Sequence, residues 1–269
     1  SCTRVDVEVL RGLSPPLRSW EWKCQAAVAG DEIIGVCPWQ SPALGMAVDL
    51  GTTKIAGYLI DLKEGKTLAS KGVMNPQISY GEDIISRIQA TLSSPTAGAD
   101  MQRAAVEALN QLASDLCGEA GVAVSDMVDA VVVSNTAMHH LLLRLPVKQL
   151  VLAPFVPAVS RALDCKARDV GLGFASGAYV HFLPNIAGFV GGDHVAMLLA
   201  TMEAKPKGLV MALDIGTNTE VSLIDGENVS SVSCASGPAF EGYHIGHGMR
   251  AARGAIEKVR IENGAIRIQ

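Results

Sequence analysis

Two stretches of this chain combine an aspartate, a glycine and threonine hydroxyls at the same spacing. Residues 45–61 read GMAVDLGTTKIAGYLID, and residues 210–225 read VMALDIGTNTEVSLID. In each stretch an apolar run ends on the aspartate (Asp49 or Asp214), a glycine-threonine turn follows, and a second apolar run closes on Leu-Ile-Asp. One residue of gap aligns the two stretches, so we interpret them as a distant internal duplication.

These residue types suit a phosphate site. Glycine lets backbone N–H groups approach a phosphate closely, and threonine hydroxyls add donors. An aspartate would repel phosphate directly, but it can hold Mg²⁺ through the water molecules that this ion retains. A single Asp-Gly turn would be an ordinary hairpin, whereas two matching turns predict that one polyphosphate is clamped from both sides. The residues expected at the two turns are Gly51, Thr52, Thr53, Gly216, Thr217, Asn218 and Thr219, and the Mg²⁺-holding carboxylates are Asp49 and Asp214.

Two further segments carry residues that could serve the same site. Gly191 and Gly192 precede a predicted helix, where Asp193 could face a terminal phosphate or Mg²⁺ or simply cap the helix. Glu220 stands where a strand residue would otherwise be apolar. It could orient an attacking water, or it could lie on a solvated strand face.

Other polar segments leave their role open. His139 and His140 are adjacent and would face different sides of a helix, so a shared metal is not expected. The polar loop at 236–244 and the turns at 75–77 and 80–83 could be functional or purely structural.

The elements that position these residues follow from apolar periodicity and turn residues. Each repeat is expected to be a three-stranded meander, with strands at 46–48, 55–61 and 66–73, and at 211–213, 220–225 and 228–234. Helices are expected at 80–91, 99–117 (stopped by Gly118), 135–143 (capped by Asn135), 193–202 and 250–257. Further strands are expected at 128–133 and 180–183, with a hairpin at 259–268. Residues 1–40 read as short strands with proline breaks.

Composition excludes several classes of protein. The chain has 269 residues, a mass of 28.1 kDa, 49% hydrophobic and 18% charged residues, and a mean hydropathy of +0.28, which suits neither a disordered chain nor a coiled coil. Its net charge of −5 argues against a nucleic-acid binder. No apolar run reaches the roughly 18 residues of a membrane helix, and no secretory signal opens the chain. The six cysteines form no CxxC pair, which predicts reduced thiols in the cytoplasm.

The doubled turn resembles the two phosphate loops of the superfamily of acetate and sugar kinases, heat-shock chaperones and actin (the ASKHA superfamily). In this resemblance the first loop comprises Asp49, Gly51, Thr52, Thr53 and Lys54, and the second comprises Asp214, Gly216, Thr217, Asn218 and Thr219. Further strings, from about residue 43 onward, resemble the reductive activators of corrinoid proteins. They are NPQISYGEDIISRI at 75–88, NTAMHHLLL at 135–143, NIAGFVGGDHVA at 185–196, ASGPAFEG at 235–242 and GMRAARGAIEKV at 248–259.

This resemblance implies an α/β fold of the actin-like, ribonuclease H-like type with duplicated subdomains. We expect a small appendage or linker at 1–42, a first ATPase subdomain at 43–206, and the start of an incomplete second one at 207–269. Members of the family also carry a ferredoxin-like domain with a two-iron, two-sulfur cluster, which this chain does not contain, so the cluster is expected only outside it. A glycine-rich adenosine motif is also missing, so nucleotide binding by this chain alone is expected to be weak or absent.

The implied function is an ATP hydrolase that returns an inactive Co(II) corrinoid to Co(I). The resemblance implies ATP and Mg²⁺ as cofactors, a corrinoid protein or methyltransferase component as partner, and a homodimer. Asp49, Asp214 and Glu220 are the expected catalytic residues. Alternatives from other classes stay open: a sugar or acyl kinase of the same superfamily, an actin-like structural protein, and an inactive scaffold.

Overall fold

The computed structural model describes residues 2–216, 218–237, 246–249, 254, 256, 258–262 and 264–268. The chain divides into two compact units, residues 1–196 and 197–269, and each is described by itself below. None of the helices among the described residues is long and apolar enough to cross a membrane.

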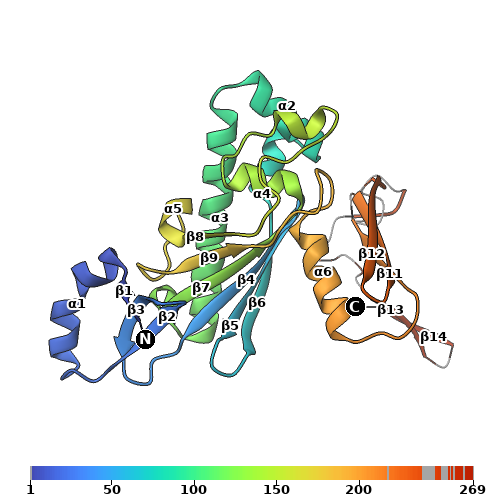
Figure 1. Ribbon diagram of the computed structural model, residues 1–269. Helices are drawn as coiled ribbons and strands as arrows, with labels where there is room; N and C mark the ends of the chain where they lie inside the picture. The colour runs from blue at the N-terminus through green and yellow to red at the C-terminus, as the bar shows by residue number, and fades with distance from the viewer. Residues whose placement is uncertain are drawn as a thin grey trace. The chain divides into compact units, whose positions relative to one another are not determined.

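A six-stranded mixed sheet forms the centre of the first unit (Figure 1), with the strand order β6-β5-β4-β7-β9-β8. Its strands are β4 (Leu44–Leu50), β5 (Lys54–Asp61), β6 (Lys66–Met74), β7 (Met127–Val133), β8 (Leu163–Lys166) and β9 (Tyr179–Phe182). The first three strands form the expected antiparallel meander. Strand β7 runs parallel to β4, and β9 runs parallel to β7, so these three strands end at the same edge of the sheet.

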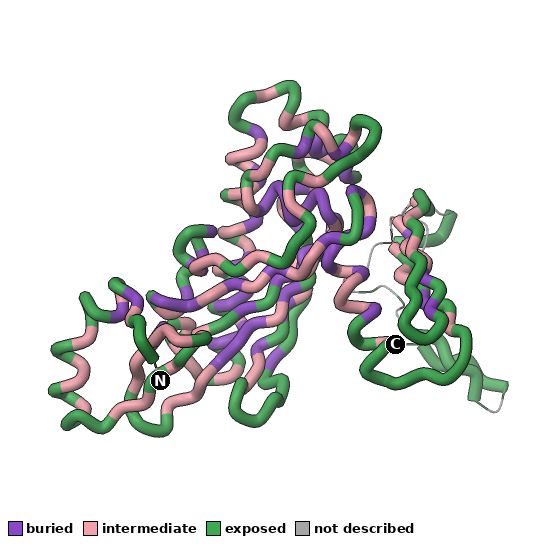
Figure 2. The backbone as a smooth tube through the Cα atoms, in the orientation of Figure 1, coloured by how far each residue is buried: buried purple, intermediate pink, exposed green. Residues whose placement is uncertain are grey.

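Helices α2 (Ile84–Ser93), α3 (Ala97–Ala120) and α4 (Thr136–Leu142) pack with this sheet in one apolar core. Residues of α3 that recur every three or four positions are almost completely buried: Met101, Ala105, Leu109, Leu112 and Leu116. Figure 2 shows this buried layer along the sheet and the helices above it. The helix continues past Gly118 and ends at Ala120. The next residue, Gly121, has a φ of 68°, the left-handed conformation that favours glycine. The expectation that Gly118 stops this helix was therefore wrong.

The segment expected as one helix at 80–91 is divided. Residues Pro76–Tyr80 form a short 3-10 helix (η1), and α2 begins only at Ile84. Asp83 caps α2, because its side chain accepts a hydrogen bond from the Ser86 amide at 2.7 Å. Helix α4 begins as expected, with the Asn135 side chain accepting from the Met138 amide at 3.0 Å.

The N-terminal residues build a helix that the sequence interpretation missed. Strand β1 (Arg4–Val5), helix α1 (Val7–Ser19), and strands β2 (Cys24–Ala29) and β3 (Glu32–Pro38) form a three-stranded sheet, in the order β1-β3-β2, with one helix. Pro15 and Pro16 lie inside α1 and do not break it. Proline removes an N–H donor but holds a helical φ, and Asp6 caps the start of the helix. Shorter elements complete the first unit: η2 (Val124–Asp126), η3 (Lys148–Val151) and α5 (Ala167–Val170).

The second unit contains the second meander. Helix α6 (Gly192–Glu203) leads into it, and strands β10 (Val210–Ile215), β11 (Asn218–Asp225) and β12 (Asn228–Ala235) pair antiparallel as expected. Strands β13 (Val259–Glu262) and β14 (Ala265–Ile268) form the expected hairpin. Most of the helix expected at 250–257 lies outside the described residues, as do Thr217 and most of the loop at 236–244.

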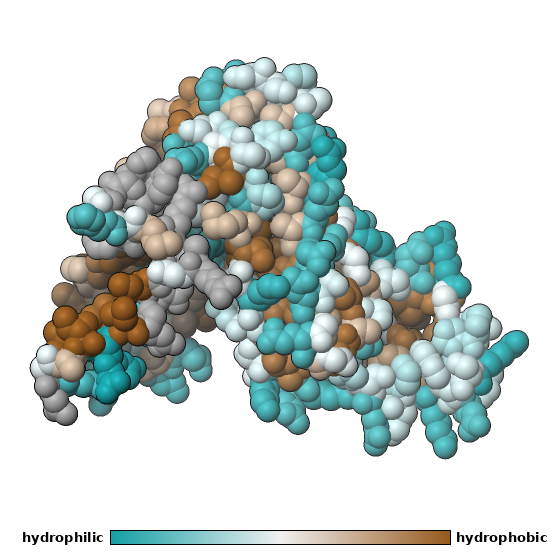
Figure 3. All heavy atoms as spheres, turned by 180° about the vertical axis from the view of Figure 1, so that it is seen from behind, coloured by the Kyte–Doolittle hydropathy of each residue, from teal (hydrophilic) through white to brown (hydrophobic). Residues whose placement is uncertain are grey.

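One face of the second meander carries its small core. Among the described residues, Leu198 of α6 is buried together with Ala212 and Ile224. On the other face Met211, Leu213 and Ile215 alternate along β10 and remain about half exposed. In the view of Figure 3, hydrophobic atoms reach the protein surface in several patches among hydrophilic ones.

Candidate functional site

Strand order places three separate loops at one edge of the large sheet. Asp49 at the end of β4 is in register with Val133 at the end of β7, and Val132 is in register with Phe182 at the end of β9. The segments that follow these strands therefore begin beside one another. In α/β sheets the carboxyl ends of parallel strands are the usual place for ligand sites.

The first of these loops is the predicted phosphate loop. Asp49 is exposed at the end of β4, and Lys54 is exposed at the start of β5. Gly51 makes the turn possible, because a Cβ at this position would lie only 2.7 Å from the Lys54 carbonyl oxygen. The Thr52 hydroxyl oxygen accepts a hydrogen bond from Asn135 Nδ2 at 3.0 Å, which ties the loop to the start of α4.

The turn between β7 and α4 joins the first loop to the glycine pair. A Cβ on Gly191 would lie 2.5 Å from both Asn135 Cα and the Ser134 carbonyl oxygen, so only glycine allows this approach. The Asp193 amide donates to the Ser134 carbonyl at 3.2 Å. The structure thus brings Thr52, Asn135 and the segment at 191–193 together within the first unit. Asn135 was expected only as a helix cap, and its link to Thr52 was not anticipated.

A buried polar cluster lies behind the first loop, and the sequence interpretation missed it. Asn75, Gln77 and Arg87 are all 0% exposed. Burial lowers the pKa of Arg87 to about 10, and the nearby Asp83 carboxylate partly opposes this effect. A signal for the cluster was present, because an arginine occurs among isoleucines on the predicted helix.

The adjacent histidines of α4 are buried and hydrogen-bonded. His140 accepts from the Ala158 amide through Nε2 at 3.0 Å, and its Nδ1 lies 2.7 Å from the Thr136 carbonyl oxygen, which assigns the proton to Nδ1. Burial lowers the pKa of His139 to about 4, and His140 adds to this effect. Both rings are therefore neutral near pH 7. Within the described ranges, no group of three His, Cys, Asp or Glu side chains could hold a metal ion.

The second predicted loop has a comparable turn with its own polar contacts. The Gly216 amide donates to the Asn218 carbonyl at 3.0 Å, and the Ser236 hydroxyl lies 2.6 Å from the Thr219 hydroxyl. Asp214 is the direct cross-strand neighbour of Glu220. Thr217, also expected here, is outside the described residues.

Glu220 is only partly exposed, and its electrostatic setting is distinctive. Its Oε1 accepts a hydrogen bond from the Ser233 hydroxyl at 2.7 Å. Burial raises the pKa of Glu220, and the negative charge of Asp214 raises it further. The first loop belongs to the first compact unit and the second loop to the other, so the clamp between them stays a prediction.

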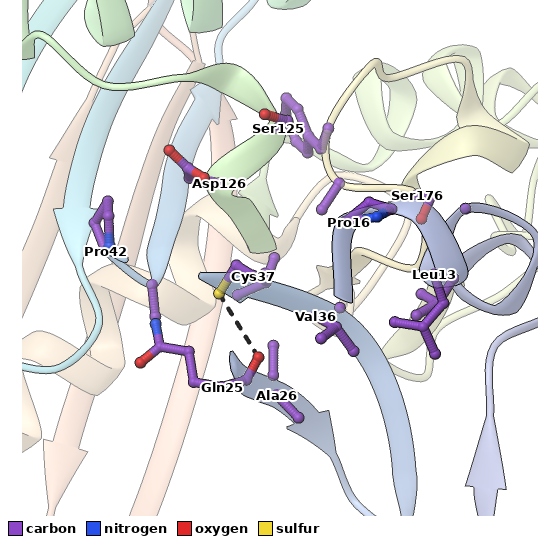
Figure 4. Close-up of a pocket in the computed structure, with 18 of the residues that line it drawn as sticks. Leu13, Pro16, Gln25, Ala26, Val36, Cys37, Pro42, Ser125, Asp126 and Ser176 are labelled. Atoms are coloured by element: carbon purple, nitrogen blue, oxygen red, sulfur yellow. Dashed lines mark hydrogen bonds between the residues drawn. The ribbon is translucent and has the colours of Figure 1, made fainter. Parts of the chain in front are cut away.

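A cavity of about 410 Å³ in the first unit lies away from the predicted site residues, none of which lines it. Figure 4 shows Leu13 and Pro16 of α1 on one side and Ala26 and Val36 of the β2–β3 hairpin on another. Cys37 donates a weak hydrogen bond to the Gln25 carbonyl at 3.8 Å in its wall. The lining is mostly apolar and has no cluster of glycines and hydroxyls, so this cavity does not resemble a phosphate site.

Comparison with known proteins gives concordant results. Residues 44–205 match the family model described as the RACo middle region, and residues 208–269 match the C-terminal domain of RACo, the ASKHA domain. The chain is 36% identical, over 242 residues, to the corrinoid activation enzyme RamQ of Eubacterium limosum, covering 89% of this chain and 40% of that protein. It is 30% identical, over 235 residues, to the Co(II) methylated amine-specific corrinoid protein reductase of Methanosarcina barkeri. This match covers 83% of this chain and 42% of that protein.

A solved structure is also similar. The chain matches a reductive activator for corrinoid, iron-sulfur protein with a TM-score of 0.85 and 33% identity, over 98% of this chain and 44% of that one. The chain thus spans less than half the length of these relatives. The match to an ASKHA domain and to this structure confirms the expected actin-like α/β fold.

Proposed function

We infer a function from the fact that this chain belongs to the RACo family. We propose that the protein containing it is an ATP-dependent reductive activator, which returns the cobalt of a corrinoid protein from Co(II) to Co(I). One electron is needed for each cobalt ion, and we propose that an iron-sulfur cluster outside this chain delivers it. ATP binding and hydrolysis would supply the free energy for this uphill step.

One observation carries the nucleotide part of this proposal. The turn at 49–54, the Ser134–Thr136 turn and the segment at 191–193 meet at the carboxyl edge of three parallel strands. We propose that Gly51, Thr52 and Thr53 bind phosphate oxygens through their amides and hydroxyls. Lys54 would add positive charge, and Asp193 would lie near the terminal phosphate.

The second loop would complete the phosphate site from the other unit. We propose that Gly216, Thr217, Asn218 and Thr219 bind the same triphosphate. Glu220 would orient the attacking water and accept its proton, and its contact with Ser233 would hold the carboxylate in place.

The carboxylates of the two turns fit Mg²⁺. Asp214 and Glu220 are cross-strand neighbours whose negative charges disfavour one another. A cation would relieve this repulsion, and carboxylate oxygens acting through water are ordinary Mg²⁺ ligands. We propose that Asp49 and Asp214 hold the ion through its water shell. When bound, Mg²⁺ would neutralise phosphate charge.

The partner, the assembly and the location of the protein are part of the same proposal. We propose a corrinoid protein of a methyltransferase system as its partner, a homodimer as its assembly, and the cytoplasm as its location. All six cysteines are free thiols, which suits a reducing compartment.

ATP hydrolysis by the complete protein, measured with and without a Co(II) corrinoid protein, tests this function. We expect the partner to stimulate hydrolysis and ATP to be required for the appearance of Co(I) in the absorption spectrum. Asp49→Asn and Asp214→Asn should each lower turnover by about 100-fold, in the range of lost electrostatic stabilisation at a phosphoryl centre.

Asp164→Asn provides the matched control. Asp164 is exposed on β8, and its one ion pair among the described residues is with His181, so this variant should keep full turnover. Turnover that is insensitive both to the corrinoid protein and to the Asp49 and Asp214 substitutions would contradict the proposed function.

A further inference from the structure

We propose that Arg87 and Asn75 are positioning residues that turn the peptide groups of the first phosphate loop so that their amides face a bound phosphate. Both side chains are completely buried behind this loop. The inference rests on the proposed function and deepens it, because it assigns the groups that give the loop its shape.

Arg87 directs its donors at backbone and side-chain acceptors around the loop. Its Nη2 donates to the Thr52 carbonyl at 2.5 Å, and its Nε donates to the Gly81 carbonyl at 2.9 Å. Its Nη1 lies 3.4 Å from Gln77 Oε1. The guanidinium therefore connects the start of α2 to the middle of the first loop, and its planar fork fixes the direction of each bond.

Asn75 holds the loop carbonyl that precedes the one held by Arg87. Its Nδ2 donates to the Gly51 carbonyl at 2.8 Å. The residue is itself anchored, because its amide donates to the Thr53 carbonyl at 2.8 Å and its Oδ1 accepts from the Gln77 amide at 3.0 Å. Two successive carbonyls of the loop, those of Gly51 and Thr52, are thus held by buried side chains.

The geometry of the peptide bond converts these contacts into an orientation for the amides. The Gly51 carbonyl shares a peptide group with the Thr52 amide, and the Thr52 carbonyl shares one with the Thr53 amide. In a trans peptide the C=O and N–H point in opposite directions, and among the described residues the only cis bond is Ala153-Pro154. The amides of Thr52 and Thr53 therefore point away from Asn75 and Arg87. Successive amides presented in this way form an anion-binding concavity.

Charge supports the same conclusion. Among the ion pairs of the described residues, none includes Arg87. The Asp83 carboxylate is near Arg87 but forms no ion pair with it. A buried cation without such a pair is costly, and its field is screened less than that of an exposed charge. A phosphate on the far side of the loop would supply the missing negative charge. Arg87 would then favour phosphate binding without touching the phosphate.

Binding of MgATP to the complete protein tests the inference by two readouts. Arg87→Met removes the guanidinium donors while keeping an unbranched apolar stem. Asn75→Ala removes the Nδ2 donor to the Gly51 carbonyl. We expect each variant to bind MgATP at least about tenfold more weakly by calorimetry, in line with the loss of a hydrogen bond that orients the loop. Arg87→Lys, which keeps the charge but has a single donor nitrogen in place of three, should bind with intermediate affinity.

Hydrogen exchange of the Thr52 and Thr53 amides gives the readout that mere destabilisation would not change. Saturating MgATP should slow exchange at these amides in the wild type and fail to do so in Arg87→Met. Ile88→Val is the matched control, because Ile88 is the buried neighbour of Arg87 and its truncation weakens packing without removing a donor. This control should keep wild-type affinity and protection.

Each result has a definite meaning. Folded Arg87→Met protein that binds MgATP like the wild type and protects both amides would overturn the inference while leaving the proposed function intact. If Arg87→Met does not fold, MgATP affinity and amide protection are measured in Arg87→Lys and Asn75→Ala instead. Wild-type values in both of these variants would overturn the inference. A wild-type protein that binds no MgATP would show that the proposed function itself is wrong, and the inference with it.

Discussion

At the scale of single residues, the site depends on a glycine that carries no functional group. Gly191 is buried where the segment before α6 crosses the turn before α4. Any side chain there would meet backbone atoms of Ser134 and Asn135, and backbone cannot move aside as a flexible side chain can. The absence of a Cβ at Gly191 thus allows the two loops to approach closely.

We expect Gly191→Ala to destabilise the first unit by about 2 kcal/mol, because an added methyl overpacks a rigid contact. Urea unfolding of the variant and wild type measures this change. Gly118→Ala is the control, since a Cβ there meets nothing within 4 Å in the last turn of α3. It should be neutral or stabilise by up to about 1 kcal/mol. Equal stability of Gly191→Ala and wild type would show that the crossing is not tight.

At the scale of elements, a buried ion cluster attaches the N-terminal strands and α1 to the large sheet (Figure 1). Asp6, only 2% exposed, lies 3.0 Å from Lys166 Nζ and accepts two hydrogen bonds from Arg168. Lys166 also contacts Glu32 at 2.9 Å, and the Tyr179 hydroxyl donates to the same carboxylate at 2.7 Å. Burial alone would raise the pKa of Asp6, but its bonds to Arg168 and Lys166 outweigh burial and hold the pKa well below its ordinary range.

Asp6→Asn should lower the free energy of unfolding by about 3 kcal/mol at pH 7, because it leaves the largely buried Lys166 ammonium with less compensation and weakens the pairing with Arg168. The contribution of Asp6 is fully present above its unfolded-state pKa of about 4 and is lost as pH falls below that value. The wild type should therefore lose more stability than the variant between pH 5 and pH 2.5, as urea unfolding at both pH values would measure.

Asp31→Asn is the control for this cluster. Asp31 pairs with Arg4 at the surface, where both side chains are largely exposed, so the cost should stay below about 1 kcal/mol. A similar effect of the two substitutions would mean that the Asp6 cluster adds nothing beyond a surface ion pair.

At the scale of the whole molecule, the two compact units have unequal cores. The first has a continuous apolar core that links the large sheet to α2, α3 and α4. In the second, the described residues include only Leu198, Ala212 and Ile224 as a buried cluster. Resistance to local opening depends on buried apolar contacts, so the units should differ in their dynamics.

Amide exchange of this chain should reveal that difference. We expect β10, β11 and β12 to exchange at least about tenfold faster than β4, β5 and β7, because opening the smaller core exposes less apolar surface. Mass spectrometry of peptides from both meanders measures the two rates. Equal protection in the two meanders would contradict the assignment of separate cores.

Much of the local structure could be predicted because its causes are local. Both meanders could be identified from apolar runs and glycine turns. The start of α4 could be identified from Asn135 as a cap. The same local reasoning was wrong for α1, where prolines were interpreted as breaks, and for the end of α3, which was expected at Gly118 and lies at Ala120. A proline or a glycine inside a helix costs free energy but does not by itself end the helix, so local sequence does not decide between continuing and stopping.

The sequence by itself determined the two Asp-Gly-Thr turns, their likeness to phosphate loops and the family resemblance that the comparisons confirmed. It could not determine that Thr52, Asn135 and Gly191 meet, because their proximity arises from the parallel pairing of β4, β7 and β9 across more than a hundred residues of chain. Nor could it determine that Arg87 is buried against the Thr52 carbonyl. Only tertiary packing decides which polar side chains of a helix face the core, since that choice depends on acceptors supplied by distant segments.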